Sequence, residues 1–246
     1  MNLILVNPSE LTSSLTSSNA LSVVLTDRRA DHIREIHQPL VGDYLRVGVL
    51  EGEIFQAKVI AIESARVVLE IDELTAAPPP KPLPVVLVMA LPRPKMLRRI
   101  LQSASSMGVK EIWLIHSYRV DKSYWSSPFL DHLALQSQLQ LGLEQACDTR
   151  MPNIYLRKRF KPFVEDELPG LASGRRAWVA HPYDACEPPS PSDQPTLLAV
   201  GPEGGFIPYE VEKLKEAGLE PLSLGQRILR VETAIPVALS RLFPVG

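Results

Sequence analysis

Cysteine is scarce in this chain of 246 residues. Its two cysteines, Cys147 and Cys186, show no framework spacing, which argues against a disulfide scaffold and favours a reducing compartment. Two thiols are also too few for a thiolate zinc cage, and the five histidines are not closely paired with carboxylates. We therefore expect no metal site.

Long hydrophobic runs are also lacking. The longest run, Val85 to Leu91, has the length of a strand, whereas a bilayer-spanning helix requires ~20 apolar residues. The segment from Met1 to Leu25 has no basic lead-in and is interrupted by Ser and Thr, unlike a signal peptide. The sequence therefore predicts a cytoplasmic protein that does not enter a membrane.

The chain also lacks an excess of positive or negative charge. The formal net charge is −2, and the 45% hydrophobic and 22% charged residues are typical of a soluble globular protein. Bulk charge therefore does not indicate a nucleic-acid partner, and an RNA-binding surface would have to be a local basic patch.

Proline is concentrated at residues 76–84, which read AAPPPKPLP and should form an extended linker between two domains. Residues 1–75 contain short β-branched and apolar runs separated by tight turns, together with one short helix at Asp31–His37. This pattern predicts a small β-barrel or sandwich. The expected strands are Leu21–Thr26, Tyr44–Leu50, Glu53–Ile62 and Arg66–Ile71.

Residues 85–246 alternate apolar runs with amphipathic segments. One helix should begin at Pro94 and end before Gly108, and a long one should cover Phe129–Arg150. The alternation predicts an α/β domain with a mostly parallel sheet covered by helices on both faces. The expected strands are Val85–Leu91, Glu111–His116, Arg175–Ala180 and Thr196–Val200.

The glycine-rich segment Val200–Phe206 follows one of these strands and precedes a helix. Its glycines let the backbone approach a ligand, although a plain strand-to-helix turn has the same composition. It lacks the Gly-Lys-Ser/Thr of a phosphate loop and the G-x-G-x-x-G of a dinucleotide site. Acidic groups would repel a phosphate and suit a neutral adenosine with a sulfonium charge; these are Glu203, Glu210 and Glu212.

A second segment, Leu224–Ala234, is constrained by Pro236. A proline clashes with the carbonyl four residues earlier, so a helix should begin at about Glu232, with Glu232 or Thr233 as the cap. The preceding loop contains Ile228 and Leu229, which must be buried. A flat adenine could cover them, or they could fill the core.

Gly-Pro-Glu-Gly-Gly-Phe at 201–206 and LGQRILRVETA at 224–234 strongly resemble the RsmE-type ribosomal RNA methyltransferases of the SPOUT superfamily. The resemblance implies a SPOUT methyltransferase domain with a C-terminal trefoil knot at 85–246, preceded by a PUA-like RNA-binding β-barrel. It also implies a homodimer that uses S-adenosyl-L-methionine to methylate N3 of a uridine in 16S rRNA of the 30S subunit.

Site residues follow from the matching motif positions. Arg230 and Glu232 are the expected catalytic residues: Arg230 would stabilise charge on the uracil oxygens, and Glu232 would orient Arg230 or receive the proton. The expected cofactor-binding residues are His181, Gly201, Pro202, Glu203, Gly204, Gly205, Leu224, Gly225, Ile228, Leu229 and Thr233.

RNA contacts are expected from basic residues, namely Arg34 in the barrel and the cluster Arg93, Lys95, Arg98 and Arg99. A second basic run lies at 157–161, and either basic segment could instead be a solvated face. Gln38 and Ser106 stand where the family has arginine and glutamate. Two alternatives stay open: a SPOUT enzyme that acts on a different RNA, and a catalytically silent RNA-binding protein.

Overall fold

The computed structural model describes residues 2–13 and 20–244. It divides into two compact units, one formed by Met1–Lys81 with Gln140–Met151, the other by Pro82–Leu139 with Pro152–Gly246. Parts of two predictions lie outside the described residues, namely the bounds of the two domains and the segment compared with signal peptides. The residues concerned are 1, 14–19 and 245–246.

The first unit is built on a six-stranded sheet with the order β1-β4-β5-β6-β3-β2. β1 pairs with β4 in parallel, and the other pairs are antiparallel. Two short helical segments, α1 (Arg28–His32) and η2 (Ile33–His37), follow β3. The strands are β1 (Ile4–Val6), β2 (Leu11–Ser13), β3 (Leu21–Leu25), β4 (Tyr44–Val49), β5 (Ile54–Ile62) and β6 (Val67–Ala77).

Alternation of side chains explains the core of this unit. Val67, Leu69 and Ile71 on β6 are buried at every second position, as expected for a strand with one face on the core. The predicted strand ended at Ile71, but β6 continues to Ala77 and takes up the first two residues of the predicted linker. β1 and β2 were not predicted, because each has only three residues.

Gln140–Met151 belongs to the first unit through its contacts. The Glu144 carboxylate, whose side chain is 3% exposed, accepts a 2.6 Å bond from Arg28. The Thr149 hydroxyl donates to the carbonyl of Gly52 at 2.5 Å. Sequence periodicity assigned this stretch to 85–246, because local patterns do not reveal such distant contacts.

The second unit is built on a six-stranded sheet with the order β12-β10-β11-β7-β8-β9, in which every pair is parallel. The central strands β7 and β11 are buried along their whole length, which explains their continuous apolar sequences. The strands are β7 (Val85–Ala90), β8 (Glu111–Ile115), β9 (Asn153–Arg157), β10 (Arg176–Ala180), β11 (Thr196–Val200) and β12 (Glu220–Leu222).

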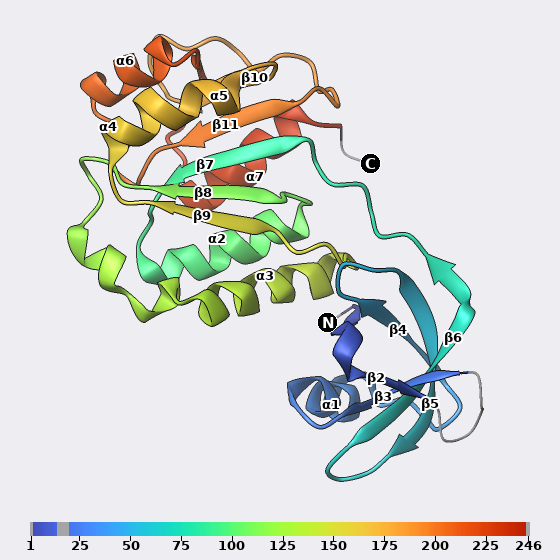
Figure 1. Cartoon of the computed structure of the whole chain (residues 1–246). Coiled ribbons are helices and arrows are strands. Elements are labelled where there is room, and N and C mark those ends of the chain that lie inside the picture. The colour runs from blue at the N-terminus through green and yellow to red at the C-terminus, as the bar shows by residue number, and fades with distance from the viewer. Residues whose placement is uncertain (1, 14–19, 245–246) are drawn as a thin grey trace. The chain divides into compact units, whose positions relative to one another are not determined.

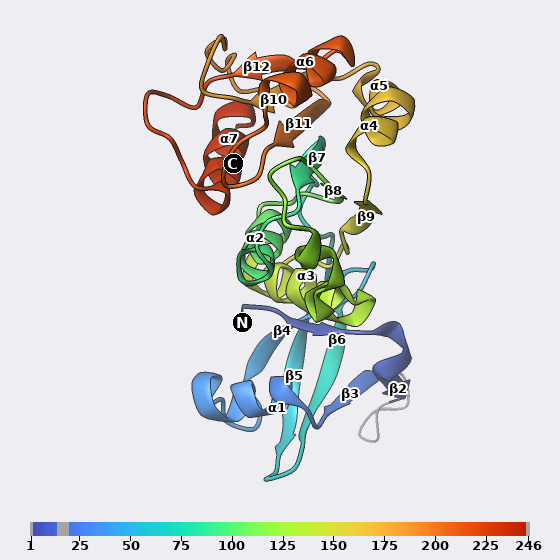
Figure 2. The ribbon, with the colours of Figure 1, turned by 90° about the vertical axis from the view of Figure 1, so that its left-hand side faces the viewer.

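Helices cover both faces of this sheet, which confirms the predicted α/β architecture. Figures 1 and 2 show α2 and α7 on one face and α4 and α5 on the other. None of the helices within the described residues has the length and apolar character needed to cross a bilayer. The helical segments are α2 (Pro94–Ser106), η3 (Lys122–Ser126), η4 (Pro128–Leu130), α3 (His132–Ala146), α4 (Phe160–Pro162), η5 (Phe163–Glu167), α5 (Leu168–Ala172), α6 (Pro208–Glu216) and α7 (Val231–Leu242).

Two helix boundaries differ from the predictions. α3 is shorter than Phe129–Arg150, because Pro128 starts a separate 3-10 turn and Cys147 has a positive φ of 55°. α7 begins at Val231, and Arg230, rather than Glu232 or Thr233, is its cap. The Arg230 carbonyl accepts the N–H groups of Thr233 and Ala234, so the first turn forms ahead of Pro236.

Candidate active site

A pocket of about 470 Å³ lies in the second unit, beyond the carboxyl ends of β10 and β11. Ligands in open parallel α/β sheets commonly bind beyond this edge. Ten of the eleven predicted cofactor-binding residues line the pocket, and Thr233 does not. The ten are His181, Gly201, Pro202, Glu203, Gly204, Gly205, Leu224, Gly225, Ile228 and Leu229.

The glycine-rich loop is held tightly at its first glycine. A Cβ on Gly201 would lie 2.9 Å from the backbone nitrogen of Phe206, so no other residue fits without moving the chain. Gly205 has a φ of +73°, a conformation that L side chains rarely adopt. At its glycines the loop therefore presents backbone to the pocket, beside the side chains of Pro202, Glu203 and Phe206.

The second loop leaves an apolar wall uncovered. Ile228 is 81% exposed although it lines the pocket, so of the two alternatives from the sequence it does not fill the core and is left uncovered. Gly225, with a φ of +114°, turns the backbone just before it. An isoleucine presented to solvent inside a pocket is an apolar surface that a ligand can cover.

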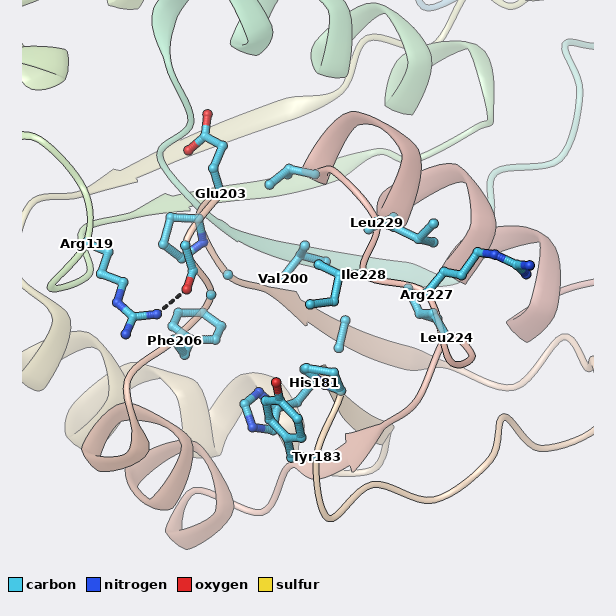
Figure 3. Close-up of a pocket in the computed structure, with 18 of the residues that line it drawn as sticks. Arg119, His181, Tyr183, Val200, Glu203, Phe206, Leu224, Arg227, Ile228 and Leu229 are labelled. Atoms are coloured by element: carbon cyan, nitrogen blue, oxygen red, sulfur yellow. Dashed lines mark hydrogen bonds between the residues drawn. The ribbon is translucent and has the colours of Figure 1, made fainter.

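Arg119 lines the same pocket and was not predicted from the sequence. It follows β8, and its guanidinium donates a hydrogen bond to the carbonyl of Gly204. Figure 3 shows Arg119 and Arg227 on opposite sides of the pocket. Other lining residues that sequence reasoning did not select are Ala180, Pro182, Tyr183, Val200, Phe206, Arg227, Val231 and Ala234.

Only one of the three acids near the glycine-rich loop reaches the pocket. The Glu210 carboxylate is 3% exposed and accepts N–H bonds from Ile207 at 3.0 Å and Tyr118 at 2.7 Å. Glu212 pairs with Lys215 at 2.9 Å. Glu203 lines the pocket, and its carboxylate accepts the backbone N–H of Arg93 at 3.2 Å. Of these three acids, Glu203 alone lines the pocket, together with the guanidinium groups of Arg119 and Arg227.

His181 adds a neutral side chain to the wall. Burial lowers the pKa of this imidazole below its ordinary value, and the carboxylate of Asp184 only partly offsets the effect. A histidine with a lowered pKa is uncharged at neutral pH. The neutral imidazole therefore adds no further positive charge to a lining that already contains Arg119 and Arg227.

Comparison with known proteins identifies the family. The family model for an RNA methyltransferase domain matches residues 79–243. The chain belongs to the RNA methyltransferase domain family. The matched segment includes every residue that lines the pocket, so the pocket lies within the methyltransferase domain.

Curated relatives agree with the resemblance seen in the sequence. The ribosomal RNA small subunit methyltransferase E of Treponema pallidum is 26% identical over 85% of this chain and 79% of its own length. The protein of the same name from Mesomycoplasma hyopneumoniae is 27% identical over 86% and 89%. The RsmE-type resemblance is thereby confirmed.

Solved structures share the fold over the whole chain. The ribosomal RNA small subunit methyltransferase E of Neisseria gonorrhoeae, bound to S-adenosyl methionine, matches with a TM-score of 0.71, 20% identity and coverage of 98% and 96%. A Legionella pneumophila protein solved with bound S-adenosylmethionine matches with a TM-score of 0.72, 20% identity and coverage of 97% and 95%.

The predicted catalytic pair of this RNA methyltransferase lies at the edge of the pocket. Arg230 is the exposed cap of α7, and Glu232 is half-buried in its first turn. Neither belongs to the pocket lining, although Leu229 and Val231 on either side of Arg230 do. Thr233 is exposed in the same turn. The catalytic roles of Arg230 and Glu232 stay predictions.

The predicted RNA-binding residues fall in both units. Arg34 lies in the first unit, where it pairs with Asp31 and donates to the carbonyl of Glu63. The second basic run is partly engaged, because Arg157 bonds to Glu167 and lies 4.6 Å from the centre of the Trp113 ring. The cluster at the start of α2 is exposed, and it comprises Arg93, Lys95, Arg98 and Arg99.

Proposed function

We propose that this chain uses S-adenosyl-L-methionine to methylate N3 of a uridine in the 16S rRNA of the small ribosomal subunit. Family membership supports RNA methylation, and the curated relatives share the name ribosomal RNA small subunit methyltransferase E. The observation that carries the proposal is the pocket that brings the two sequence motifs together at the edge of the parallel sheet.

The residues of the pocket fit this cofactor. A volume of about 470 Å³ lies within the range of small-molecule sites, and the uncovered apolar wall suits an adenine ring. The backbone of the glycine-rich loop offers hydrogen-bonding groups to the ribose and the amino acid, and Glu203 complements a positive sulfonium. When bound, S-adenosylmethionine supplies an electrophilic methyl group.

Arg230 and Glu232 are proposed to serve the uridine. Its N3 lies between two carbonyls and is only weakly acidic, so the proton must leave before the nitrogen can attack. The Arg230 guanidinium stabilises the negative charge that develops on the adjacent oxygens. Glu232 either orients that guanidinium or receives the proton. Their place beside the pocket, between Leu229 and Ala234, supports these roles.

The resemblance to RsmE-type enzymes also supports proposals about the domains and the oligomeric state. We propose that the second unit carries a C-terminal trefoil knot, that residues 1–75 belong to a PUA-like RNA-binding barrel, and that 78–84, the part of the predicted linker beyond β6, link the two domains. We also propose that the enzyme is a cytoplasmic homodimer acting on the 30S subunit. A sedimenting mass of twice 27.3 kDa at micromolar concentration is expected, and a stable monomer contradicts the dimer.

Mass spectrometry of 16S rRNA tests the substrate. A deletion strain should lack one N3-methyluridine, and the wild-type gene should restore it, whereas the Arg230→Ala gene should not. If the rRNA is unchanged and another RNA loses a methyl group, this is a SPOUT enzyme with a different substrate. Gln38 and Ser106, which depart from the family pattern, favour that alternative. If no cellular RNA accepts a methyl group, the chain is a silent RNA-binding protein.

A further inference from the structure

The loop that follows β8, residues 116–131, carries four large aromatic side chains, and we refer to it as the aromatic loop. It is anchored at several points. The Trp125 indole donates to Nδ1 of His116 at 3.0 Å, and the guanidinium of Arg98 lies 5.0 Å from the centre of the Phe129 ring. The first contact closes the loop on itself, and the second fixes it against α2.

Tyr118 stands out within the aromatic loop because its backbone is fixed while its ring is exposed. Its N–H donates to the buried Glu210 carboxylate at 2.7 Å. Its neighbours Ser117 and Val120 are at most 5% exposed, and they are joined by a 3.0 Å hydrogen bond that closes a turn. The tyrosine itself is 78% exposed. A rigidly mounted aromatic ring in solvent is a preorganised stacking surface.

Three contacts join the aromatic loop, the start of α2 and the glycine-rich loop. Arg119 bonds to the carbonyl of Gly204, which Figure 3 shows as a dashed line. The Arg93 N–H bonds to the Glu203 carboxylate, and Arg98 lies over Phe129. Tyr118 and the basic start of α2 therefore lie beside the pocket, all within the second unit.

This face is positively charged. Six exposed cations lie on the start of α2 and on the aromatic loop, and none of them is ion-paired with a carboxylate of the described residues. The aromatic loop also carries two exposed carboxylates, Asp121 and Asp131, so positive charge predominates on this face. The six cations are Arg93, Lys95, Arg98, Arg99, Arg119 and Lys122.

We propose that this face holds an unpaired strand of RNA, with one base stacked on the Tyr118 ring and the phosphates held by the cations of α2. Exposed aromatic rings interleaved with cations are how proteins bind single-stranded RNA, because stacking requires unpaired bases. Duplex RNA offers phosphates but no free base face. The proposal rests on the proposed function, and it names the form of RNA that the site takes.

Binding of an unpaired 12-nucleotide RNA, followed by fluorescence anisotropy, tests this proposal without methyl transfer. Tyr118→Ala should raise the Kd by roughly 5- to 150-fold, the range that removal of one stacked base gives. Tyr118→Phe should stay within about twofold of wild type, because it keeps the ring. Tyr118→Leu, which has an apolar side chain but no ring, should bind as poorly as Tyr118→Ala.

Two controls make the outcome specific. The same sequence within a fully paired duplex should bind wild type and Tyr118→Ala equally, and all variants should keep wild-type affinity for S-adenosylmethionine. Lys95→Ala should lower the slope of log Kd against log salt by about 0.7, the value for one phosphate contact on a single strand.

Equal Kd values for wild type and Tyr118→Ala, or equal losses on unpaired and duplex RNA, would overturn the stacking role. If wild type still methylated RNA in that case, the proposed methyltransferase function would hold although the stacking role of Tyr118 would not. If wild type binds no RNA and methylates none, both proposals fail.

Discussion

The first unit contains a polar cluster around Arg29, and the second contains the pocket. The two regions differ in how far their side chains are covered and bonded by the rest of the chain. Arg29 is 8% exposed and donates to the Leu5 carbonyl at 2.8 Å, to Glu10 at 2.5 Å and to Asp27 at 2.7 Å. In the pocket, by contrast, Ile228 is 81% exposed. The first arrangement stabilises a fold, whereas the second leaves surface for a ligand.

This comparison separates residues that support stability from residues that support function. Removal of a side chain from the satisfied cluster leaves charges without partners, so it should affect unfolding. Removal of an exposed pocket side chain should affect only what binds there. Variants of each kind test this distinction.

The largest effect is expected at Arg230, beside the pocket. Arg230→Ala should lower the rate of methyl transfer by ~10²–10³-fold, because one preorganised donor to the developing charge is lost. Affinity for S-adenosylmethionine should change by less than about tenfold, since Arg230 does not line the pocket. Single-turnover kinetics and calorimetry measure the two quantities.

Arg230→Lys should recover little activity, because a point charge cannot span two carbonyl oxygens as a planar guanidinium does. Methylation by Arg230→Ala at the wild-type rate would remove Arg230 from the mechanism.

The next effect is expected in the first unit. Arg29→Ala should lower the free energy of unfolding by about 2–3 kcal/mol, because Glu10, Asp27 and the Leu5 carbonyl lose their donor. Urea unfolding measures this change. The exposed Arg66, paired with Glu63, is the matched control, and Arg66→Ala should unfold like wild type. Neither variant should alter affinity for S-adenosylmethionine.

The same cluster predicts a pH dependence. Hydrogen bonds from Arg29 hold the pKa values of Glu10 and Asp27 below their ordinary range. Their contribution to stability is therefore present above the ordinary carboxyl pKa and is lost as pH falls through the lowered values. Arg29→Ala should lack this acid-dependent loss. Identical acid unfolding of the two proteins would contradict the assigned network.

The opposite pattern is expected at Ile228. Ile228→Ala should weaken binding of S-adenosylmethionine by about 1–2 kcal/mol, because the apolar wall loses contact area with the adenine. The free energy of unfolding should be unchanged, since this side chain is already exposed. Leu133→Ala is a matched control at a residue that is 78% exposed on α3, and it should alter neither quantity. If Ile228→Ala lowered the free energy of unfolding but kept its affinity for S-adenosylmethionine, Ile228 would support the fold rather than the ligand site.

The smallest effect is expected from His181. Its lowered pKa keeps the imidazole neutral at pH 7, so affinity for S-adenosylmethionine should be constant from pH 8 down to about 6.5. As the pH falls further, through the lowered pKa, a positive imidazolium should form, oppose the sulfonium and weaken binding. Calorimetry across this range, with His181→Gln as a variant without the charge, measures the effect. Equal pH profiles of the two proteins would exclude His181 as its source.

Sequence patterns could predict the parts of the site that are local in the chain. The glycine-rich loop and the Leu224–Ala234 loop each carry their own motif, so most of the pocket lining was selected. Arg119 could not be found in this way, because it reaches the pocket only through the strand order, in which β8 lies two strands from β11. The sequence also left open whether Ile228 fills the core or faces a ligand, because periodicity does not show which apolar side chains of a loop the rest of the chain covers.

The strands β9 and β12 were not predicted, for similar reasons. β12 contains Pro221, which is tolerated because β12 lies at the edge of its sheet. β9 ends at Arg157 and leads into the basic run, so its residues resembled a charged surface segment. Its place at the other edge, beside β8, is a property of the assembled sheet.

Calorimetric titration of S-adenosylmethionine into wild type and Gly204→Val tests whether this pocket binds the cofactor. A Cβ on Gly204 would meet the flexible Arg119 side chain at 2.9 Å, so the variant can fold while its side chain occupies ligand space. We predict that wild type binds the cofactor and that the folded variant, judged by an unchanged unfolding transition, does not. Equal affinity in both proteins, or no binding by wild type, would contradict the assignment of this pocket to the cofactor.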